Sequence, residues 1–358
     1  MMFFFFWGCS VHYRLIFLLF LAWCPSFTSW AAPAQQAFGD WLVTCNNQNF
    51  CLARNVGNHR GLVMTLGRSA GAHTDAGLRI ELGGPENLLP KTPAIAPRLL
   101  FDGRPLTLAG ERWQVAPWLL STSDSATINR FLQHIQDGQA ISLKQGNQSI
   151  SLAGLKAALL FIDDRQKRVG SETAWIGKGD EPPLSVPPAP ALKSVARVNP
   201  TAAPFSREEL NDLLDYGNVR MNNSACSLDP QRREIWVTPL TDEKALLIQS
   251  CESGAYNTIY LAWLVSREKP FTARQINLRL PFLPPDSDSR DIELVNATFD
   301  GKTQELTTLE KLRGAGDCGV QTRWRYDGQR FRLVRYAGMP VCDNWQGPDA
   351  WPTLWITR

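Results

Sequence analysis

Histidine is scarce in this chain, and close cysteine pairs and nucleophile motifs are missing. Only 4 of the 358 residues are histidine, and His59, His73 and His134 lie far from one another. Zinc sites need Cys or His ligands at short spacings such as CxxC, which does not occur here. The GxSxG turn that exposes a catalytic serine is also missing. The sequence therefore predicts no metal, no cofactor and no recognisable catalytic residue.

The chain also has no large excess of positive or negative charge. The formal net charge is +3, charged residues make up 20% of the chain, and hydrophobic residues make up 44%. This composition is typical of a globular protein and gives no indication of a nucleic-acid partner. An electrostatic partner would therefore have to bind a local patch of charge.

Long apolar segments are missing beyond the N-terminus. Residues 15–23 form an apolar run behind His12 and Arg14, and this run is too short to span a bilayer as a helix. Small residues follow at 31–34. We interpret residues 1–34 as a signal peptide and expect the mature protein in the periplasm. No later segment has about 18 consecutive apolar residues, so we expect no transmembrane segment in the mature chain.

Six of the eight cysteines remain after the predicted signal peptide. An even number of cysteines in an exported chain indicates disulfide bonds. The sequence does not fix which cysteines pair, but their clustering favours three local pairs: Cys45 with Cys51, Cys226 with Cys251, and Cys318 with Cys342.

A proline-rich segment separates two regions of the chain. Residues 179–204 contain seven prolines and no periodic apolar pattern, which is typical of a semi-rigid, extended linker. Short strand-like runs dominate on both sides, without sustained strand–helix alternation. We therefore predict a mainly β (α+β) fold with two disulfide-stapled, β-rich domains at residues 35–178 and 205–358, and a few peripheral helices.

The first domain opens with a predicted hairpin. Residues 38–45 are expected to form one strand, residues 46–50 a polar turn, and residues 51–54 the returning strand. This arrangement places the first two cysteines of the mature chain opposite each other.

Three helices are predicted from apolar spacing and end signals. Residues 128–135 and 152–162 have helical spacing, and Ser151 is placed to cap the second of these helices. A capping box at 206–209 begins the third helix, which Gly217 is expected to end.

Three segments resemble a family of bacterial exported proteins catalogued as domain of unknown function 1176. They are residues 251–257 (CESGAYN), 311–319 (KLRGAGDCG) and 351–355 (WPTLW). With the opening at 38–45, the resemblance covers nearly the whole mature chain and implies a periplasmic location. The first domain also resembles the invasion-associated locus B family, through its Asp-Trp and two-cysteine opening and the ISLAGL segment at 150–155. No catalytic residues are assigned to the first family, so none is carried over.

Two motifs of known chemistry have simpler structural interpretations. Residues 314–319 match GxGxxG, but a strand pattern follows and Cys318 is a predicted disulfide cysteine, so we expect a tight turn. Asp286, Asp288 and Asp291 resemble a calcium loop. Because the glycine and the glutamate that an EF-hand needs are missing, we expect a solvated loop.

Two further groups are expected to be structural. Asp163 and Asp164 are adjacent near a helix end and point to different sides, so we expect solvent exposure rather than an acid–base pair. Three tryptophans near the C-terminus are expected to seal a small core rather than to stack on sugars. They are Trp345, Trp351 and Trp355.

The hairpin around the Asp-Gly pair at 327–328 carries an unusual charge pattern. A two-residue loop predicts that Arg325 opposes Arg330 and that Arg323 opposes Arg332 on one face of the sheet. We call these four residues the arginine ladder. Directly opposed like charges destabilise a sheet by about 0.2–1 kcal/mol per pair, so we expect anionic groups to lie across the ladder.

Two interpretations of the arginine ladder stay open. Carboxylates of a neighbouring strand, such as Glu293, neutralise it, or it is a docking face for an anionic envelope polymer or an acidic protein. The leading hypothesis is a non-catalytic binding or interaction protein of the cell envelope. One alternative is an envelope-acting hydrolase of glycans or esters, because glycosidases need only two carboxylates placed by the fold. Another is a structural envelope component, which internal pairing of every ladder arginine would favour.

Overall fold

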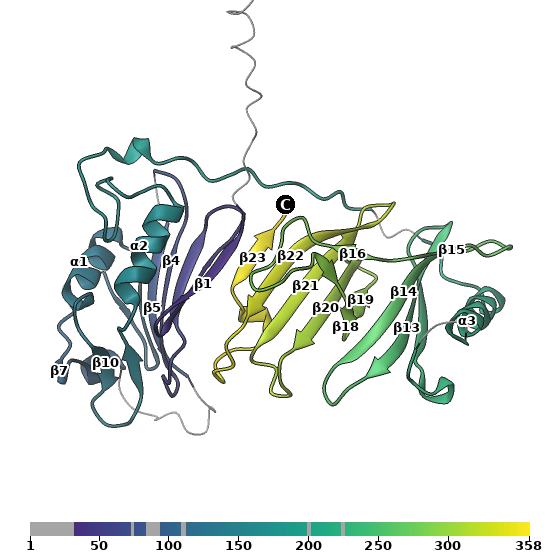
Figure 1. Ribbon diagram of the computed structural model, residues 1–358, viewed down its shortest axis with the longest axis horizontal. Coiled ribbons are helices and arrows are strands. Elements are labelled where there is room, and N and C mark those ends of the chain that lie inside the picture. The colour runs from purple at the N-terminus through teal and green to yellow at the C-terminus, as the bar shows by residue number, and fades with distance from the viewer. Residues whose placement is uncertain (1–31, 73–74, 84–93, 109–111, 199–201, 223–225) are drawn as a thin grey trace, which may run out of the picture. The chain divides into compact units, whose positions relative to one another are not determined.

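The protein is mainly β, as predicted (Figure 1). The computed structural model describes residues 32–72, 75–83, 94–108, 112–198, 202–222 and 226–358. The predicted signal peptide lies almost wholly outside the described residues. Within them, no helix is both long enough and apolar enough to cross a membrane. Disulfides link the three expected pairs: Cys45–Cys51, Cys226–Cys251 and Cys318–Cys342.

Two antiparallel sheets form the first part of the fold. The larger sheet has the order β1-β2-β3-β4-β5-β9-β8. Its strands are β1 (Ala34–Phe38), β2 (Trp41–Cys45), β3 (Cys51–Asn55), β4 (Leu62–Arg68), β5 (Ala76–Leu82), β8 (Gln114–Val115) and β9 (Leu119–Thr122). The smaller sheet, β11-β10-β6-β7, consists of β6 (Leu99–Phe101), β7 (Arg104–Pro105), β10 (Ala140–Leu143) and β11 (Ser149–Ser151).

The predicted cysteine hairpin is present, but its first strand begins later than expected. β2 and β3 pair in a register that places Cys45 opposite Cys51. The residues before Trp41 belong to the separate strand β1, because the chain turns at Gly39 with φ +53°. A side chain at Gly39 would lie 2.7 Å from the carbonyl oxygen of Ala153, so this turn requires glycine.

Helices α1 (Ser125–Ile135) and α2 (Leu155–Arg165) pack their apolar residues into the same core as the larger sheet, which confirms both spacing-based predictions. The predicted cap of α2 is wrong. Ser151 ends β11, and the residue before the helix is Gly154, with φ +92°. A side chain at Gly154 would lie 2.0 Å from the carbonyl oxygen of Phe38, so the contact with β1 determines where the helix begins.

Helix α3 (Arg207–Asn222) begins with the predicted capping box. The Ser206 hydroxyl accepts a hydrogen bond from the Glu209 backbone N–H at 3.1 Å, and the Glu209 carboxylate accepts one from the Ser206 N–H at 3.3 Å. Gly217 does not end the helix, contrary to our expectation. It lies against β13, where the Gln249 side chain donates to the Gly217 carbonyl at 2.7 Å, so close packing explains the glycine.

Two five-stranded sheets and a short ribbon form the rest of the fold. One sheet contains β12 (Ile235–Pro239), β13 (Lys244–Ser253), β14 (Thr258–Ser266), β15 (Ala273–Gln275) and β18 (Leu294–Val295). The other contains β19 (Thr298–Asp300), β20 (Glu305–Lys311), β21 (Gly319–Tyr326), β22 (Phe331–Met339) and β23 (Thr353–Ile356). The ribbon pairs β16 (Leu278–Arg279) with β17 (Asp291–Ile292). Side chains of all three share one apolar core.

The proline-rich segment makes specific contacts. Its backbone exchanges two hydrogen bonds with the last residue of the chain: Val195 N–H donates to the Arg358 carbonyl at 3.0 Å, and Arg358 N–H donates to the Lys193 carbonyl at 2.7 Å. The segment therefore runs beside the end of β23. Residues Ala31–Arg358 form one compact unit, and the predicted domain boundaries at 178 and 205 stay a prediction.

Candidate functional site: a basic groove beside the arginine ladder

The turn of the β21–β22 hairpin is longer than expected. It has four residues, 327–330, instead of two. Asp327 Oδ1 accepts hydrogen bonds from the backbone N–H groups of Gln329 and Arg330, both at 2.9 Å. An aspartate that accepts hydrogen bonds from backbone N–H groups of its own turn stabilises that turn. The Asp-Gly pair alone indicates a two-residue turn and not this longer one.

The longer turn changes which arginines face each other. Arg325 lies opposite Arg332, and beyond a bulge in β22, Arg323 lies opposite Arg335. Two opposed like-charged pairs are therefore present, as expected, but the predicted register is wrong. Arg335 takes part in place of Arg330, which lies in the turn itself.

Carboxylates from elsewhere in the chain neutralise three of these arginines. The ion pairs are Arg323 with Asp349 at 2.9 Å, Arg325 with Glu305 at 2.7 Å, and Arg332 with Asp327 at 2.7 Å. Glu293, the partner that we expected, is not among them. Arg335 donates to the Gln321 side-chain oxygen at 2.6 Å, and burial, followed by the charge of Arg323, lowers the pKa of Arg335. The paired arginines therefore have a structural role within the sheet.

Arg330 differs from the other ladder arginines. It is exposed, and its guanidinium has no hydrogen bond or ion pair to any residue that the structure describes. It borders a groove of about 610 Å³ at the turn end of the hairpin. Lys193, Arg279 and Arg332 line the same groove, and Asp327 is its only carboxylate among the described residues. The groove is therefore strongly basic.

The floor of the groove is apolar, and one wall carries both polar and apolar side chains. The floor is formed by Trp324, Phe331, Leu333 and Trp355, which are largely buried in the core. The proline-rich segment forms the wall, through residues 193–196. Basic groups above an aromatic floor suit a ligand that carries phosphate or carboxylate on a ring or a chain.

The single groove carboxylate is held in its charged form. Burial raises the pKa of Asp327, but hydrogen bonds from Arg332 and from the backbone of Arg330 and Gln329 outweigh burial, so the pKa is lowered overall. Asp327 therefore neutralises Arg332 at any ordinary pH. The charge available to a ligand comes from Arg330 and Arg279, because Arg279 reaches Asp291 only at 3.6 Å and both side chains are exposed.

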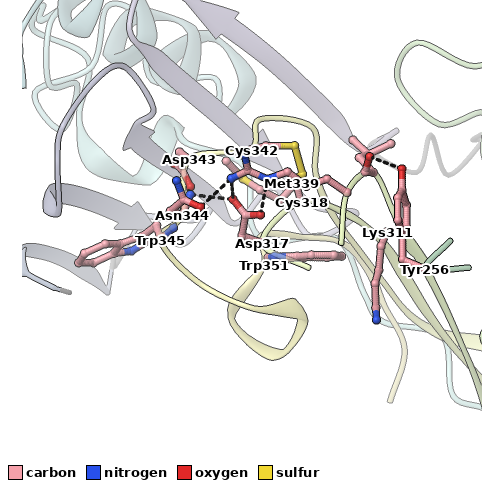
Figure 2. The surroundings of a disulfide bond; sticks show 12 residues. Tyr256, Lys311, Asp317, Cys318, Met339, Cys342, Asp343, Asn344, Trp345 and Trp351 are labelled. Atoms are coloured by element: carbon pink, nitrogen blue, oxygen red, sulfur yellow. Dashed lines mark hydrogen bonds and ion pairs between the residues drawn. A yellow bond between two sulfur atoms is a disulfide. The ribbon is translucent and has the colours of Figure 1, made fainter. Parts of the chain in front are cut away.

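Residues 314–319 form a tight turn ahead of a strand, the arrangement that we expected in place of a nucleotide site (Figure 2). Arg313 donates to Asp317 through two nitrogens, at 2.8 and 2.6 Å. These bonds lower the pKa of Asp317 to about 2. The Cys318–Cys342 disulfide joins the turn to the segment after β22.

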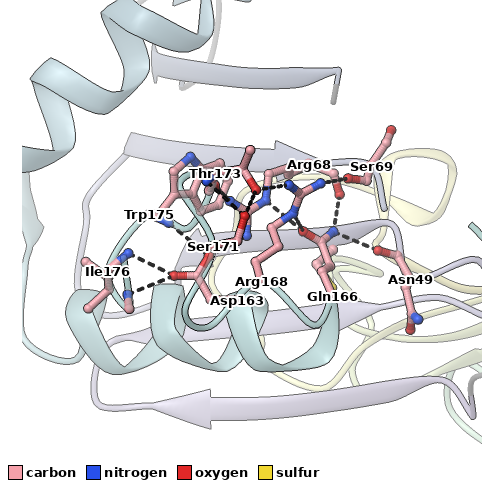
Figure 3. A network of polar contacts seen from close by, with 12 residues as sticks. Asn49, Arg68, Ser69, Asp163, Gln166, Arg168, Ser171, Thr173, Trp175 and Ile176 are labelled. Carbon is pink, nitrogen blue, oxygen red and sulfur yellow. Dashed lines mark hydrogen bonds and ion pairs between the residues drawn. The ribbon is translucent and has the colours of Figure 1, made fainter. Parts of the chain in front are cut away.

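Asp163 is buried, so the prediction that it faces solvent is wrong (Figure 3). Its carboxylate accepts hydrogen bonds from Arg68 at 2.6 Å and from the backbone N–H groups of Trp175 at 3.0 Å and Ile176 at 2.8 Å. The neighbouring Asp164 is exposed, as expected. The two side chains do point to different sides, and one of those sides is the protein interior.

A second buried arginine completes this network. Gln166 Oε1 accepts hydrogen bonds from Nε of Arg68 at 2.7 Å and Nε of Arg168 at 3.2 Å. Burial, followed by the charge of Arg68, lowers the pKa of Arg168 to about 10. Every one of these groups has partners inside the protein, so the network joins β4 to the segment after α2 and offers no free group for a ligand.

The C-terminal tryptophans pack into the protein to different extents. Trp351 and Trp355 are buried, as expected for residues that seal a core, and Trp345 is half-buried. No group of three or more His, Cys, Asp or Glu side chains could hold a metal ion in the part of the chain that the structure describes.

The fold and the site define a mainly β, disulfide-linked protein with a basic groove. The family described as "Protein of unknown function (DUF1176)" matches residues 35–358, so the chain belongs to this family. The "Uncharacterized protein YpfG" of Escherichia coli (strain K12) is 67% identical over 348 residues, which cover 97% of this chain and 100% of that relative. No solved structure matches the chain. The resemblance of the first domain to the invasion-associated locus B family stays a prediction.

Proposed function

We propose that this chain is an exported periplasmic protein that binds an anionic ligand of the cell envelope in its basic groove, without catalysing a reaction. The observation that carries the proposal is the groove itself, in which Arg330 has no partner among the described residues while Arg279 is exposed beside it. The predicted signal peptide and the three disulfides support the location, because disulfides persist in oxidising compartments.

The chemistry of the groove favours an anion with an apolar body. A guanidinium binds phosphate or carboxylate through two parallel hydrogen bonds. Arg330 has no partner among the described residues, and Arg279 meets Asp291 only at 3.6 Å between two exposed side chains. The aromatic floor offers apolar contact to the body of the same ligand. Because these two arginines are exposed, their attraction for an anion weakens as salt is added.

A structural role in the envelope is the second candidate. The ion pairs of Arg323, Arg325 and Arg332 favour it, because they show that most of the arginine ladder serves the sheet. The basic groove does not favour the envelope hydrolase, because Asp327 is its only carboxylate among the described residues and glycosidases need two.

Binding by the mature chain, residues 35–358, tests the proposal. The probes are lipopolysaccharide, phosphatidylglycerol vesicles and polyglutamate, which represent a polymer, a lipid surface and an acidic protein. We compare the wild type with the double variant Arg279→Gln/Arg330→Gln. The matched control is Arg323→Gln, which removes an arginine of the same hairpin that already pairs with Asp349.

We expect at least one probe to bind the wild type and the double variant to lose about tenfold in affinity, which corresponds to about 1.4 kcal/mol. The control should stay within about twofold, since its charge is already neutralised. Equal affinity of the wild type and the double variant for all three probes would favour the structural role.

A further inference from the structure

A second cleft of opposite charge lies on the core-facing side of β20–β22. Its volume is about 360 Å³. The segment between β16 and β18, which includes β17, forms one wall, and three strands of the neighbouring sheet contribute Thr308, Glu310, Val320 and Tyr336. Four carboxylates line the cleft, from Asp286, Asp291, Glu293 and Glu310, and no lysine or arginine does so among the described residues.

Most of this negative charge has no counterpart within the described protein. The side chains of Asp286, Glu293 and Glu310 are exposed and form no hydrogen bond or ion pair with any described residue. Asp291 contacts Arg279 at 3.6 Å. Three carboxylates therefore border the cleft without an internal cation, whereas most of the arginine ladder is neutralised by pairs at 2.7–2.9 Å.

The Tyr336 hydroxyl is a separate indication of a ligand. The residue is only 5% exposed, yet no hydrogen bond within the described residues involves its hydroxyl group. The hydroxyl oxygen itself keeps some exposure, so it opens onto the cleft that Tyr336 lines and a ligand can reach it there. The hydroxyls of Thr308 and Thr322, in the same cross-strand row, satisfy each other at 2.6 Å and leave Tyr336 without a partner.

The Tyr336 side chain lines the cleft together with Glu310. The ring leans along β22 over Gly338, where its Cε1 atom lies 3.6 Å from the position that a Cβ of Gly338 would occupy. Gly338 is in register with Val320, and Val320 is in register with Glu310. The phenol end of the ring therefore approaches the row that holds Glu310. Burial, followed by the charge of Glu310, raises the pKa of Tyr336 to about 12, so the hydroxyl stays protonated.

We propose that this acidic cleft binds a primary alkylammonium ion, with the ammonium between Glu310, Glu293 and the Tyr336 oxygen. An ammonium has three N–H donors and no acceptor, which suits two carboxylates and one hydroxyl oxygen. Ile292, Val295 and Val320 supply apolar walls for an alkyl chain. A linear diamine fits this combination, because the second ammonium can remain near the exposed Asp286.

A bare metal ion fits the cleft less well than an ammonium. Calcium takes six to eight oxygen ligands, with several carboxylates converging at about 2.3–2.6 Å. No group of acidic, histidine or cysteine side chains in the described ranges is arranged in that way. The apolar walls also offer no side-chain ligand atoms to a metal ion.

Calorimetric titration of the mature chain with 1,5-diaminopentane tests this proposal, with 1,5-pentanediol as the uncharged analogue and Ca²⁺ as the competing cation. Two variants remove the proposed contacts. Glu310→Gln removes an exposed charge that has no internal partner, and Tyr336→Phe removes only the hydroxyl. Asp288→Asn is the matched control, since Asp288 lies in the same loop, is exposed and does not line the cleft.

We expect the diamine to bind the wild type with a dissociation constant of about 1 mM or tighter, and the diol not to bind. Glu310→Gln should weaken diamine binding at least fivefold and Tyr336→Phe about threefold or more, while Asp288→Asn stays within twofold. The proposal is overturned if the diamine does not bind, if the diol binds equally well, if Ca²⁺ alone binds, or if Glu310→Gln and Asp288→Asn behave alike. A negative result for the acidic cleft would not affect the proposal for the basic groove, because the two sites are tested with probes of opposite charge.

Discussion

Replacing Asp163 by alanine should destabilise the protein severely, because this carboxylate is the only negative group among the described residues of a buried network with two arginines (Figure 3). Its oxygens accept hydrogen bonds from Arg68 and from the backbone of Trp175, Ile176 and Gly177. Removing it leaves Arg68 charged and buried without a counterion. Breaking a buried ion pair in this way costs about 3–5 kcal/mol, which is a large part of the 5–15 kcal/mol that stabilises a typical domain.

The neighbouring carboxylate supplies the matched control for this prediction. Asp164 is exposed, and its contact with Lys167 at 3.6 Å is between two exposed side chains. Asp164→Ala should therefore change the free energy of unfolding by less than about 0.5 kcal/mol. The two substitutions remove the same chemical group from adjacent positions, so any difference between them comes from burial and pairing.

Urea denaturation of residues 35–358, followed by far-ultraviolet circular dichroism, measures both variants. Tryptophan fluorescence adds a second probe of global unfolding, because tryptophans are spread along the chain. We expect Asp163→Ala to unfold at a much lower urea concentration, or not to fold at all, while Asp164→Ala follows the wild type. If the two variants differed by less than about 1 kcal/mol, the buried network would not stabilise the fold as argued.

Three further predictions concern the disulfide, the acid limit of stability and a helix start. Replacing Cys318 and Cys342 together by serine should lower the free energy of unfolding by about 3.5 kcal/mol, since a loop with a sequence separation of 24 is opened; a denaturation midpoint equal to the wild type's contradicts this. The paired Asp317 has a lower pKa in the folded state, about 2, than in the unfolded chain, so its stabilisation is complete above pH 4 and is lost as the pH falls toward 2. Asp317→Asn should flatten the loss of stability over that window, and an unchanged acid titration by circular dichroism would show that the pair contributes little. Gly154→Ala should destabilise by about 2 kcal/mol or more, because φ is +92° and the new methyl group would meet the Phe38 carbonyl; thermal unfolding at the wild-type temperature would contradict this.

Local patterns in the sequence predicted the elements of the fold well. The capping box at Ser206, the helical spacing of α1 and the cysteine hairpin all depend on residues a few positions apart, and all three are confirmed. Where we interpreted a glycine or a helix cap from neighbouring residues alone, a contact with a distant strand determined where the helix begins or ends. Gly217 continues its helix because β13 packs against it, and Gly154 replaces Ser151 at the start of α2 because β1 approaches closely.

The candidate site was predictable only in part, because it depends on register and on contacts between distant residues. The Asp-Gly pair indicated a hairpin, but the side chain of Asp327 stabilises a four-residue turn that shifts the arginines. Arg279 and Lys193 belong to the groove, yet nothing in their local sequence marks them. Arg68 lies 95 positions from Asp163, so no spacing rule could have paired them.

Photo-crosslinking at the hairpin turn in intact cells tests the central claim, an anionic envelope ligand in the basic groove, most directly. A photoreactive residue replaces Gln329, which is exposed beside Arg330, and a second preparation carries it at the exposed Lys302 as the control. We expect position 329 alone to capture a component that carries phosphate or carboxylate groups, and the capture to disappear when Arg330 is changed to glutamine. Equal capture at both positions, or capture at 329 that survives Arg330→Gln, would contradict the claim.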